Sequence, residues 1–287
     1  MPAISLVVCL HQQRDLLERL LQKSAGCYDD LVVVHDGPDE TNVRSVVAAA
    51  GGRFFERPRE NQQEPHWPFA WGQAKPDWVL KLDADEFPSP ELKVWLQAFR
   101  QAPEPDLPGY TCIWPLWNGH KAISKKCWDG RIFLFDRRRV KFFGMAEQGM
   151  IPEGKVKPLA LTLHHQPKRK SYGLHNVLQR QQAYRWREII ARSLLGKPTD
   201  LACWRWTAET WPPEWEQIRQ QPLRTALKRL VLGIFRSLRY HWRLERKLFV
   251  EASLNGPINH ALICLKFWQV QRRPSSKRQT HHLGTFG

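Results

Sequence analysis

The sequence predicts an α/β fold with a mostly parallel central sheet and a helical, basic C-terminal extension. Short apolar runs rich in β-branched residues alternate with segments in which apolar residues recur at helical spacing. Strands and helices in alternation indicate βαβ units, and the strands of such units lie parallel. Basic residues then gather on one side of a helical pattern near the carboxyl end. These three observations define the predicted class.

The elements of the first half follow in order along the chain. Apolar runs predict strands at residues 4–10, 31–34, 53–56 and 78–82. Helical spacing of leucine, valine and alanine predicts helices at residues 15–21 and 43–50, and the second of these stops at Gly51-Gly52. In parallel sheets of this kind, ligands bind beyond the carboxyl ends of the strands. The residues that follow each strand are therefore the first candidates for a site.

Composition indicates an enzyme-sized protein. The chain has 287 residues, enough for one large domain or for a domain with an appendage. Its six cysteines include no C-x-x-C pair, which argues against a zinc ribbon or a disulfide framework and favours a reducing cytosol. Neither a secretory leader pattern nor an apolar run of roughly 18 to 20 residues is found. We therefore expect a cytoplasmic protein.

The net charge of +16 is concentrated in the tail. From residue 222 onward there are 13 of the 44 Lys and Arg residues but only 2 of the 28 Asp and Glu residues. Proline-rich stretches at residues 211–214 and 221–222 mark a border just before this change. We expect a catalytic domain over residues 1–221 and a basic tail over residues 222–287.

The most informative motif follows the apolar run at residues 78–82, which ends in carboxylates at Asp83, Asp85 and Glu86. In an extended backbone, residues two apart point the same way, so Asp83 and Asp85 project together, and Ala84 leaves room for a ligand. Mg²⁺ and Mn²⁺ prefer oxygen ligands and take only one or two from the protein beside substrate phosphates. The spacing predicts a metal site. A chance triplet in a solvated loop is the competing interpretation.

A second acidic strand end lies upstream, where Asp36, Gly37 and Asp39 follow the run at residues 31–34. If the strands are parallel, these carboxylates and Asp83 open on the same crevice. Asp, Gly and Pro are also the residues that turns select, so a purely structural turn is the alternative.

Several further segments keep a recognisable order: residues 4–8, 30–37, 77–86, 128–138, 143–147 and 161–165. In these segments the chain resembles the family 2 glycosyltransferases, which have the GT-A fold, a Rossmann-like fold for nucleotide-diphospho-sugar transferases. It is most similar to the bacterial branch that adds glucose or similar sugars to the lipopolysaccharide core. The resemblance covers about residues 3 to 190. Where this branch has a His-Glu pair, the chain has Ala146-Glu147, so only the glutamate carries over.

The resemblance implies a set of donor and metal contacts. A nucleoside diphosphate sugar, with a UDP-sugar as the favoured donor, would be bound by Asp36, Asp39, Asp83 and Arg131. Mg²⁺ or Mn²⁺ would be held by Asp83, Asp85 and one of His164 and His165, and would neutralise the leaving diphosphate. The alternative for the two histidines is that they only hydrogen-bond a loop at the end of a strand.

An inverting transfer also needs a general base for the acceptor hydroxyl. The resemblance favours Glu147, with Asp129 as the rival. The structural alternatives are that Glu147 caps a turn and that Asp129 pairs with Arg131. The run Arg137–Arg139 is typical of a solvated face, with phosphate binding as the second interpretation.

The tail predicts a basic amphipathic helix. At 100° per residue, seven cations fall within an arc of roughly 100°: Lys228, Arg229, Arg236, Arg239, Arg243, Arg246 and Lys247. The other side is apolar, formed by Leu227, Leu230, Val231, Ile234, Phe235, Leu238, Trp242 and Phe249. A second apolar piece is predicted at residues 258–270. Such helices lie on anionic membranes, which suits a glycan or lipid-linked acceptor at the inner face of the cytoplasmic membrane. Packing of the apolar side on the catalytic domain is the alternative.

Two other classes of function use the same features. Clustered arginines and 14 tryptophans occur in nucleic-acid-binding proteins, but no RNP, zinc-finger or helix-turn-helix signature is found, so no nucleic acid is expected. A metal-dependent nucleotidyl or phosphoryl transferase uses the same paired carboxylates. The absence of a Walker A pattern lowers the ATPase version of that function.

Overall fold

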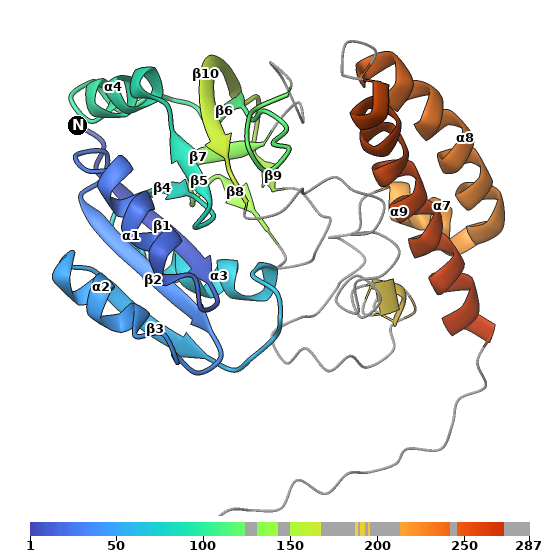
Figure 1. Ribbon diagram of the computed structural model, residues 1–287, viewed down its shortest axis with the longest axis horizontal. Helices are drawn as coiled ribbons and strands as arrows, with labels where there is room; N and C mark the ends of the chain where they lie inside the picture. Colours follow the sequence, from blue (N-terminus) through green and yellow to red (C-terminus); the bar gives the residue numbers. More distant parts are fainter. Residues whose placement is uncertain are drawn as a thin grey trace, which may run out of the picture.

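The computed structural model describes residues 1–123, 131–142, 150–167, 187–188, 190–192, 195, 213–241 and 246–272 (Figure 1). The strands are β1 (Ile4–Leu10), β2 (Asp30–Asp36), β3 (Arg53–Arg57), β4 (Trp78–Lys81), β5 (Glu86–Pro88), β6 (Gly109–Ile113), β7 (Ile132–Asp136), β8 (Val140–Lys141), β9 (Ile151–Pro152) and β10 (Lys157–His165). The helices are α1 (Arg14–Lys23), α2 (Val43–Ala49), the 3₁₀ turn η1 (Glu64–His66), α3 (Trp67–Gln73), α4 (Pro90–Phe99), α7 (Pro213–Gln220), α8 (Pro222–His241) and α9 (Arg246–Arg272).

The main sheet has eight strands in the order β3-β2-β1-β4-β7-β6-β10-β5. The first four strands are mutually parallel, β7 is antiparallel to both β4 and β6, β10 is parallel to β6, and β5 is antiparallel to β10. Six strands therefore run one way, and only β5 and β7 run the other way. The carboxyl ends of β2, β1 and β4 meet at one edge of the sheet.

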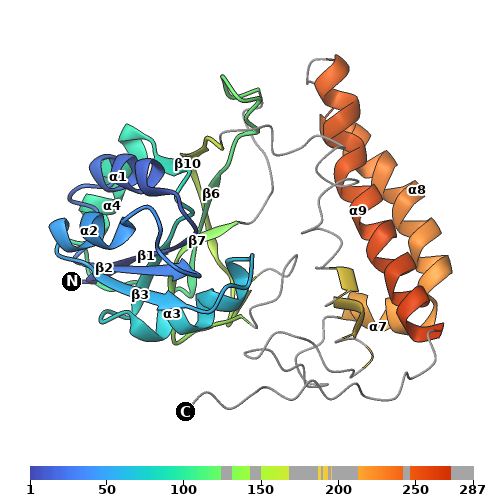
Figure 2. The ribbon, with the colours of Figure 1, turned by 60° about the horizontal axis from the view of Figure 1, so that its bottom comes forward.

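Both faces of this sheet are covered, which explains the continuous apolar strands. Alternate residues of β1 enter two different cores. Leu6 and Val8 pack with α1, α2 and α4, whereas Val7 and Cys9 pack with α3. Figure 2 shows α1, α2 and α4 on one side of the strands and α3 on the other. The predicted fold class, an α/β fold with a mostly parallel central sheet and a helical C-terminal region, is confirmed.

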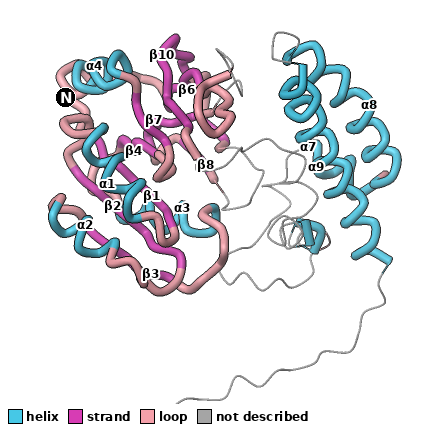
Figure 3. Tube along the Cα trace, viewed as in Figure 1, coloured by secondary structure: helices cyan, strands magenta, loops and turns pink. Residues whose placement is uncertain are grey.

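The C-terminal region is helical, as expected, but its division differs from the prediction. The single amphipathic helix expected to run through Phe249 is two helices, α8 and α9 (Figure 3). The piece predicted to begin at Ile258 belongs to α9, which continues through Pro257. Folding back lets α9 bury Ile263 and Phe267 against α7 and α8, a gain that outweighs the cost of an interior proline.

The apolar residues of the two tail helices have different surroundings. The α9 residues Ile263, Cys264, Phe267 and Val270 form a core with Ile218 of α7 and Ala226 of α8, together with Ile190 and Ala191. In contrast, α8 leaves large apolar side chains exposed. Ile190, Ala191 and Ile218 precede the border expected between residues 221 and 222, which stays a prediction.

Among the described residues, no helix is long and apolar enough to cross a membrane.

Candidate functional site

The two aspartates of the predicted metal motif lie on a tight turn between β4 and β5. Leu82, the residue after β4, is still hydrogen-bonded to β1, because its N–H donates to the Val7 carbonyl at 3.3 Å. The turn then closes through Glu86, whose N–H donates to the Asp83 carbonyl at 2.9 Å and whose carboxylate accepts the Asp83 N–H at 2.8 Å. This pair of bonds fixes the backbone that presents Asp83 and Asp85 at the carboxyl end of β4.

Two cations hold the carboxylate of Asp83. Arg131, at the start of the run that forms β7, donates from Nη2 to Asp83 Oδ2 at 2.9 Å, and Lys81 Nζ lies 3.5 Å from Oδ1. Burial alone would raise the pKa of Asp83, but Lys81 and Arg131 outweigh it and hold the pKa well below its ordinary value. Asp83 is therefore ionised and charge-compensated.

Glu86 is the hub of the turn and has no exposed surface. Its carboxylate pairs with Arg131 at 2.8 Å and accepts the indole N–H of Trp114 at 2.7 Å. Burial raises the pKa of Glu86, and the nearby Arg131 guanidinium opposes that shift. With three different donors on one carboxylate, Glu86 positions Arg131 and Trp114 around the Asp83 turn.

Strand β10 brings His165 to the same place. Because β10 pairs antiparallel with β5, His165 lies opposite Glu86 in the register. His165 Nε2 is 3.5 Å from Asp85 Oδ2, and its ring stacks on Trp114 with centroids 4.2 Å apart and planes 20° from parallel. The Trp114 ring thus links the Glu86 hub to the histidine that faces Asp85.

The structure does not bring His164 to this group. Adjacent residues of a strand point to opposite faces, and His164 lies on the side of α4, where it interacts electrostatically with Glu91. Burial lowers the pKa of His164, and Glu91 opposes the shift. Of the two histidines left open by the sequence, His165 has the better position for a metal.

The donor set at the turn fits a hard divalent cation that keeps most of its own shell. Asp85 supplies a carboxylate and His165 an imidazole, and Mg²⁺ or Mn²⁺ needs few protein ligands when phosphates and water supply the rest. Within the described part of the chain, no three His, Cys, Asp or Glu side chains converge as a ready-made metal site. Asp83 is engaged by Arg131 and Lys81, which leaves Asp85 and His165 as the first-choice ligands.

Asp36, at the end of β2, is buried and organises the neighbouring loop. It accepts from His66 Nε2 at 2.9 Å and from the Glu60 N–H at 2.5 Å, and it pairs with Arg59 at 3.5 Å. Burial acts to raise its pKa, but His66, the Glu60 N–H and Arg59 together hold the pKa below its ordinary value. Strands β2, β1 and β4 are neighbours and run parallel, so Asp36 and Asp83 both lie at the carboxyl ends of the strands, with β1 between them.

Asp39 lies four residues before α2, which begins at Val43 and has Asn42 as its N-cap residue. Its two carboxylate oxygens accept the N–H groups of Val43 and Arg44 at 2.9 and 2.8 Å. A carboxylate that accepts backbone N–H groups of the first turn is favoured at a helix N-terminus, which accounts for an aspartate at this position. Contacts of Asp36 and Asp39 with a nucleotide stay a prediction.

We expect Asp36→Asn to lower the free energy of unfolding by about 1–3 kcal/mol at pH 7, because an amide cannot accept all the donors around this side chain. The lowered pKa of Asp36 means that its contribution is present above the pKa of the unfolded chain and is lost as pH falls through the folded-state pKa. The difference between variant and parent should therefore shrink below about pH 4. Urea unfolding at pH 7, 5 and 3 measures it.

The matched control is Asp106→Asn, which removes an almost fully exposed carboxylate paired with Arg139. It should change stability by no more than about 0.5 kcal/mol. A difference for Asp36→Asn that stays constant from pH 7 to pH 3 would contradict the assigned charge state.

The two candidates for the general base, Glu147 and Asp129, lie outside the described residues. Arg131 forms ion pairs with Asp83 and Glu86, and its contact with a donor stays a prediction.

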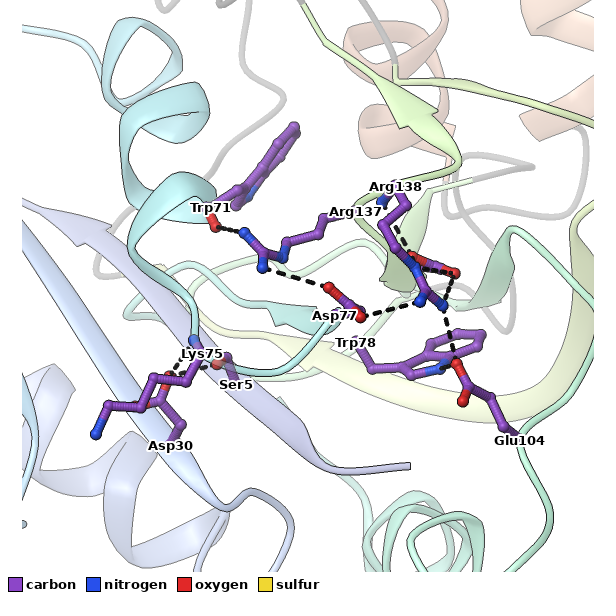
Figure 4. A network of polar contacts seen from close by, with 10 residues as sticks. Ser5, Asp30, Trp71, Lys75, Asp77, Trp78, Glu104, Arg137 and Arg138 are labelled. Atoms are coloured by element: carbon purple, nitrogen blue, oxygen red, sulfur yellow. Dashed lines mark hydrogen bonds and ion pairs between the residues drawn. The ribbon is translucent and has the colours of Figure 1, made fainter. Parts of the chain in front are cut away.

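The run Arg137–Arg139 lies at the opposite edge of the sheet, where β4 begins (Figure 4). Arg138 pairs with Asp77, Glu104 and Asp136, and Arg137 pairs with Asp77 and donates to the Trp71 carbonyl. Arg139 pairs with Asp106. These side chains form a surface ion-pair network that is separated from the Asp83 turn by the length of β4.

The sequence places Glu86 in the acidic motif but assigned it no role, and sequence reasoning missed Trp114 as part of the site. A carboxylate directly before Phe87-Pro88 looks like a loop residue, and the only local signal was its place beside the D-x-D triplet. The sequence around Trp114 carries no such signal, because Trp114 reaches the site only through the pairing of β6 with β10.

Several solved structures align with almost the whole chain. A mannosyltransferase from Pyrobaculum calidifontis, in complex with GDP-Man and Mn²⁺, is 13% identical, with 93% of this chain and 88% of that chain covered and a TM-score of 0.47. Residues 1–349 of S. aureus TarS, in complex with UDP-GlcNAc, are 13% identical, with 93% and 92% covered and a TM-score of 0.47.

A shorter alignment is found with the CMP:2-keto-3-deoxy-manno-octonic acid synthetase complexed with CTP, at 16% identity and a TM-score of 0.31. It covers 40% of this chain and 54% of that one, so the chain spans about half the length of that protein. No protein-family model and no curated protein sequence matches the chain. All three TM-scores are below 0.5.

Proposed function

We propose that the protein is a metal-dependent, inverting glycosyltransferase of family 2 type, which transfers a hexose from a nucleoside diphosphate sugar to a glycan or lipid-linked acceptor. The observation that carries the proposal is the Asp83–Glu86 turn, which places Asp85 beside His165 at the carboxyl edge of a mostly parallel sheet. A UDP-sugar is the favoured donor. The resemblance to the branch that glycosylates the lipopolysaccharide core supports a role in cell-envelope glycan synthesis.

The roles of the residues follow from their positions. Asp85 and His165 would hold Mg²⁺ or Mn²⁺, which acts as a Lewis acid on the leaving diphosphate. Asp83, compensated by Lys81 and Arg131, keeps the turn in place and leaves Arg131 near the donor. Desolvation at this edge strengthens each of these charge interactions.

Attachment to the inner face of the cytoplasmic membrane completes the proposal, since a lipid-linked acceptor lies there. The exposed apolar side chains of α8 support it, among them Leu227 at 65% and Phe235 at 68% exposure.

A donor screen tests the reaction class. Purified protein is incubated with a panel of UDP-, GDP-, CDP- and dTDP-sugars in Mn²⁺, Mg²⁺ or chelator, and the released nucleotide is identified. We expect nucleoside diphosphate to be released only with metal, and most with one UDP-sugar. Release of pyrophosphate, or transfer of a nucleoside monophosphate, would instead assign a nucleotidyl transferase. The absence of metal-dependent turnover with every donor would overturn the proposal.

We expect Glu147→Gln to lower transfer by at least about 100-fold, the contribution typical of a positioned general base. Donor binding, measured by calorimetry, should stay unchanged, because the base acts on the acceptor. Glu153→Gln, which removes an exposed carboxylate paired with Lys141, is the control and should keep full activity. If Glu147→Gln keeps full turnover, the base assignment is wrong and Asp129→Asn becomes the variant to test.

A further inference from the structure

A basic pocket lies between α8 and α9, remote in sequence from the Asp83 turn. Its volume is about 490 Å³. Side chains that matter for its chemistry are Thr225, Lys228, Arg229, Arg236, Ser237 and His260. None of the described residues that line the pocket is acidic. The lining thus combines three cations of α8 with an imidazole of α9, while the Thr225 hydroxyl donates to the Gln217 carbonyl at 3.1 Å.

The pocket exists because the two helices approach closely at small residues. A Cβ atom on Gly233 would lie 3.1 Å from the Pro257 ring, so the helix axes meet there with almost no side chain between them. Arg229 faces His260 on one side of this contact, and Ser253 donates to the Ser237 carbonyl on the other side, which shows that the helices run antiparallel. Long basic side chains therefore converge beside the contact instead of filling it.

The hydrogen bond between Arg229 and His260 sets the chemistry of the imidazole. Arginine has only donors, so at the 2.9 Å contact His260 Nδ1 accepts from Arg229 Nη1. The proton of the neutral ring is then on Nε2. A ligand that offers several acceptor oxygens and negative charge suits these groups, and a phosphate has both.

An apolar stripe on α8 borders the pocket. Its members recur every four residues along the helix, and all are exposed: Leu223, Leu227, Val231 and Phe235. On a helical projection Phe235 and Lys228 are neighbours, and Leu232, which is exposed and also lines the pocket, comes next. Basic donors and exposed apolar surface thus adjoin on one helix.

We infer that the α8–α9 pocket binds the phosphate of an anionic phospholipid headgroup, while the apolar stripe contacts the acyl region. The inference rests on the proposed membrane attachment and adds a defined headgroup site to it. Phosphate oxygens match the cations of the pocket, and acyl chains match the stripe. A free phosphate or a nucleic-acid backbone offers the same charge but nothing for the exposed leucines and Phe235.

Vesicle flotation of the full chain tests the site. The variant Lys228→Gln/Arg236→Gln removes two exposed cations that line the pocket, and the control Arg219→Gln/Arg224→Gln removes two exposed cations of α7 and α8 that do not. Binding is measured to phosphatidylcholine vesicles with and without 30% phosphatidylglycerol, across a salt series. We expect the parent to bind only the anionic vesicles, and the pocket variant to bind at least about 10-fold more weakly than the control variant.

The outcomes distinguish between the possible anionic ligands of the pocket. Equal weakening in both variants means diffuse attraction and overturns the pocket while membrane attachment stands. Failure of the parent to bind anionic vesicles overturns both, without touching the donor screen that tests sugar transfer. Saturable binding of inorganic phosphate or duplex RNA in the absence of vesicle binding assigns the pocket to another anion. Circular dichroism melts of both variants should match the parent.

Discussion

Asp85→Asn is expected to lower metal-dependent turnover by at least about 100-fold and to weaken Mn²⁺ binding by about 10- to 100-fold. The reason is that Asp83 and Asp85 have different partners within the motif. Arg131 and Lys81 hold Asp83, whereas Asp85 faces the imidazole of His165 at 3.5 Å. Replacing one oxygen of Asp85 by an amide nitrogen removes the anionic ligand but keeps the shape of the turn.

Mn²⁺ affinity is measured by electron paramagnetic resonance of the free ion, so the result does not depend on activity. Asp77→Asn is the matched control, because Asp77 lies next to the opposite end of β4 and pairs with Arg137 and Arg138 (Figure 4). It should bind Mn²⁺ as the parent does. Full metal-dependent turnover in Asp85→Asn would show that the central assignment is wrong.

Glu86→Gln is expected to lower the free energy of unfolding by about 1–3 kcal/mol and Mn²⁺ affinity by about 10- to 100-fold. The Glu86 carboxylate accepts from the Asp83 N–H, Arg131 and Trp114. Glutamine has one acceptor oxygen, so its amide group would face one of these donors and leave it unsatisfied in a buried site. Trp114, and with it the stacked His165, would then lose its fixed position.

The control for this variant is Glu104→Gln. Glu104 also accepts from an indole N–H, that of Trp78, and pairs with Arg138, but its side chain is 52% exposed. Loss of such an exposed pair should cost no more than about 1 kcal/mol and leave Mn²⁺ binding unchanged. Urea unfolding and Mn²⁺ titration of both variants separate a positioning role from general destabilisation. If Glu86→Gln loses stability but keeps parental Mn²⁺ affinity, the link through Trp114 to the metal site is excluded.

The first four parallel strands could be predicted closely from the sequence. β1 matches its expected range of residues 4–10, and β4 ends one residue before the expected position. The physical reason is that parallel strands buried on both faces read as unbroken apolar runs, and each is bounded by turn residues. The meeting of Asp36 and Asp83 at one sheet edge followed from that parallel order.

The remaining part of the site depends on long-range pairing, which local patterns do not encode. The register of the antiparallel pair β5–β10 decides which histidine faces Asp85. A shift of one residue would exchange His165 and His164. The tail prediction failed at Pro257 for a related reason, because packing against α7 and α8 overrides local helix propensity.

The pairing of β5 with β10 has a consequence for folding. Asp85 and His165 are 80 positions apart in sequence, and the hydrogen bonds between their strands join them only after β6 and β7 have taken their places between β4 and β10. Such non-local contacts form late, because chain closure is costly until the intervening structure is present. A nascent chain that has not yet delivered residue 165 has the aspartates but not the histidine. At the proposed metal site, tight binding of a divalent ion would therefore report completion of the chain as well as activity.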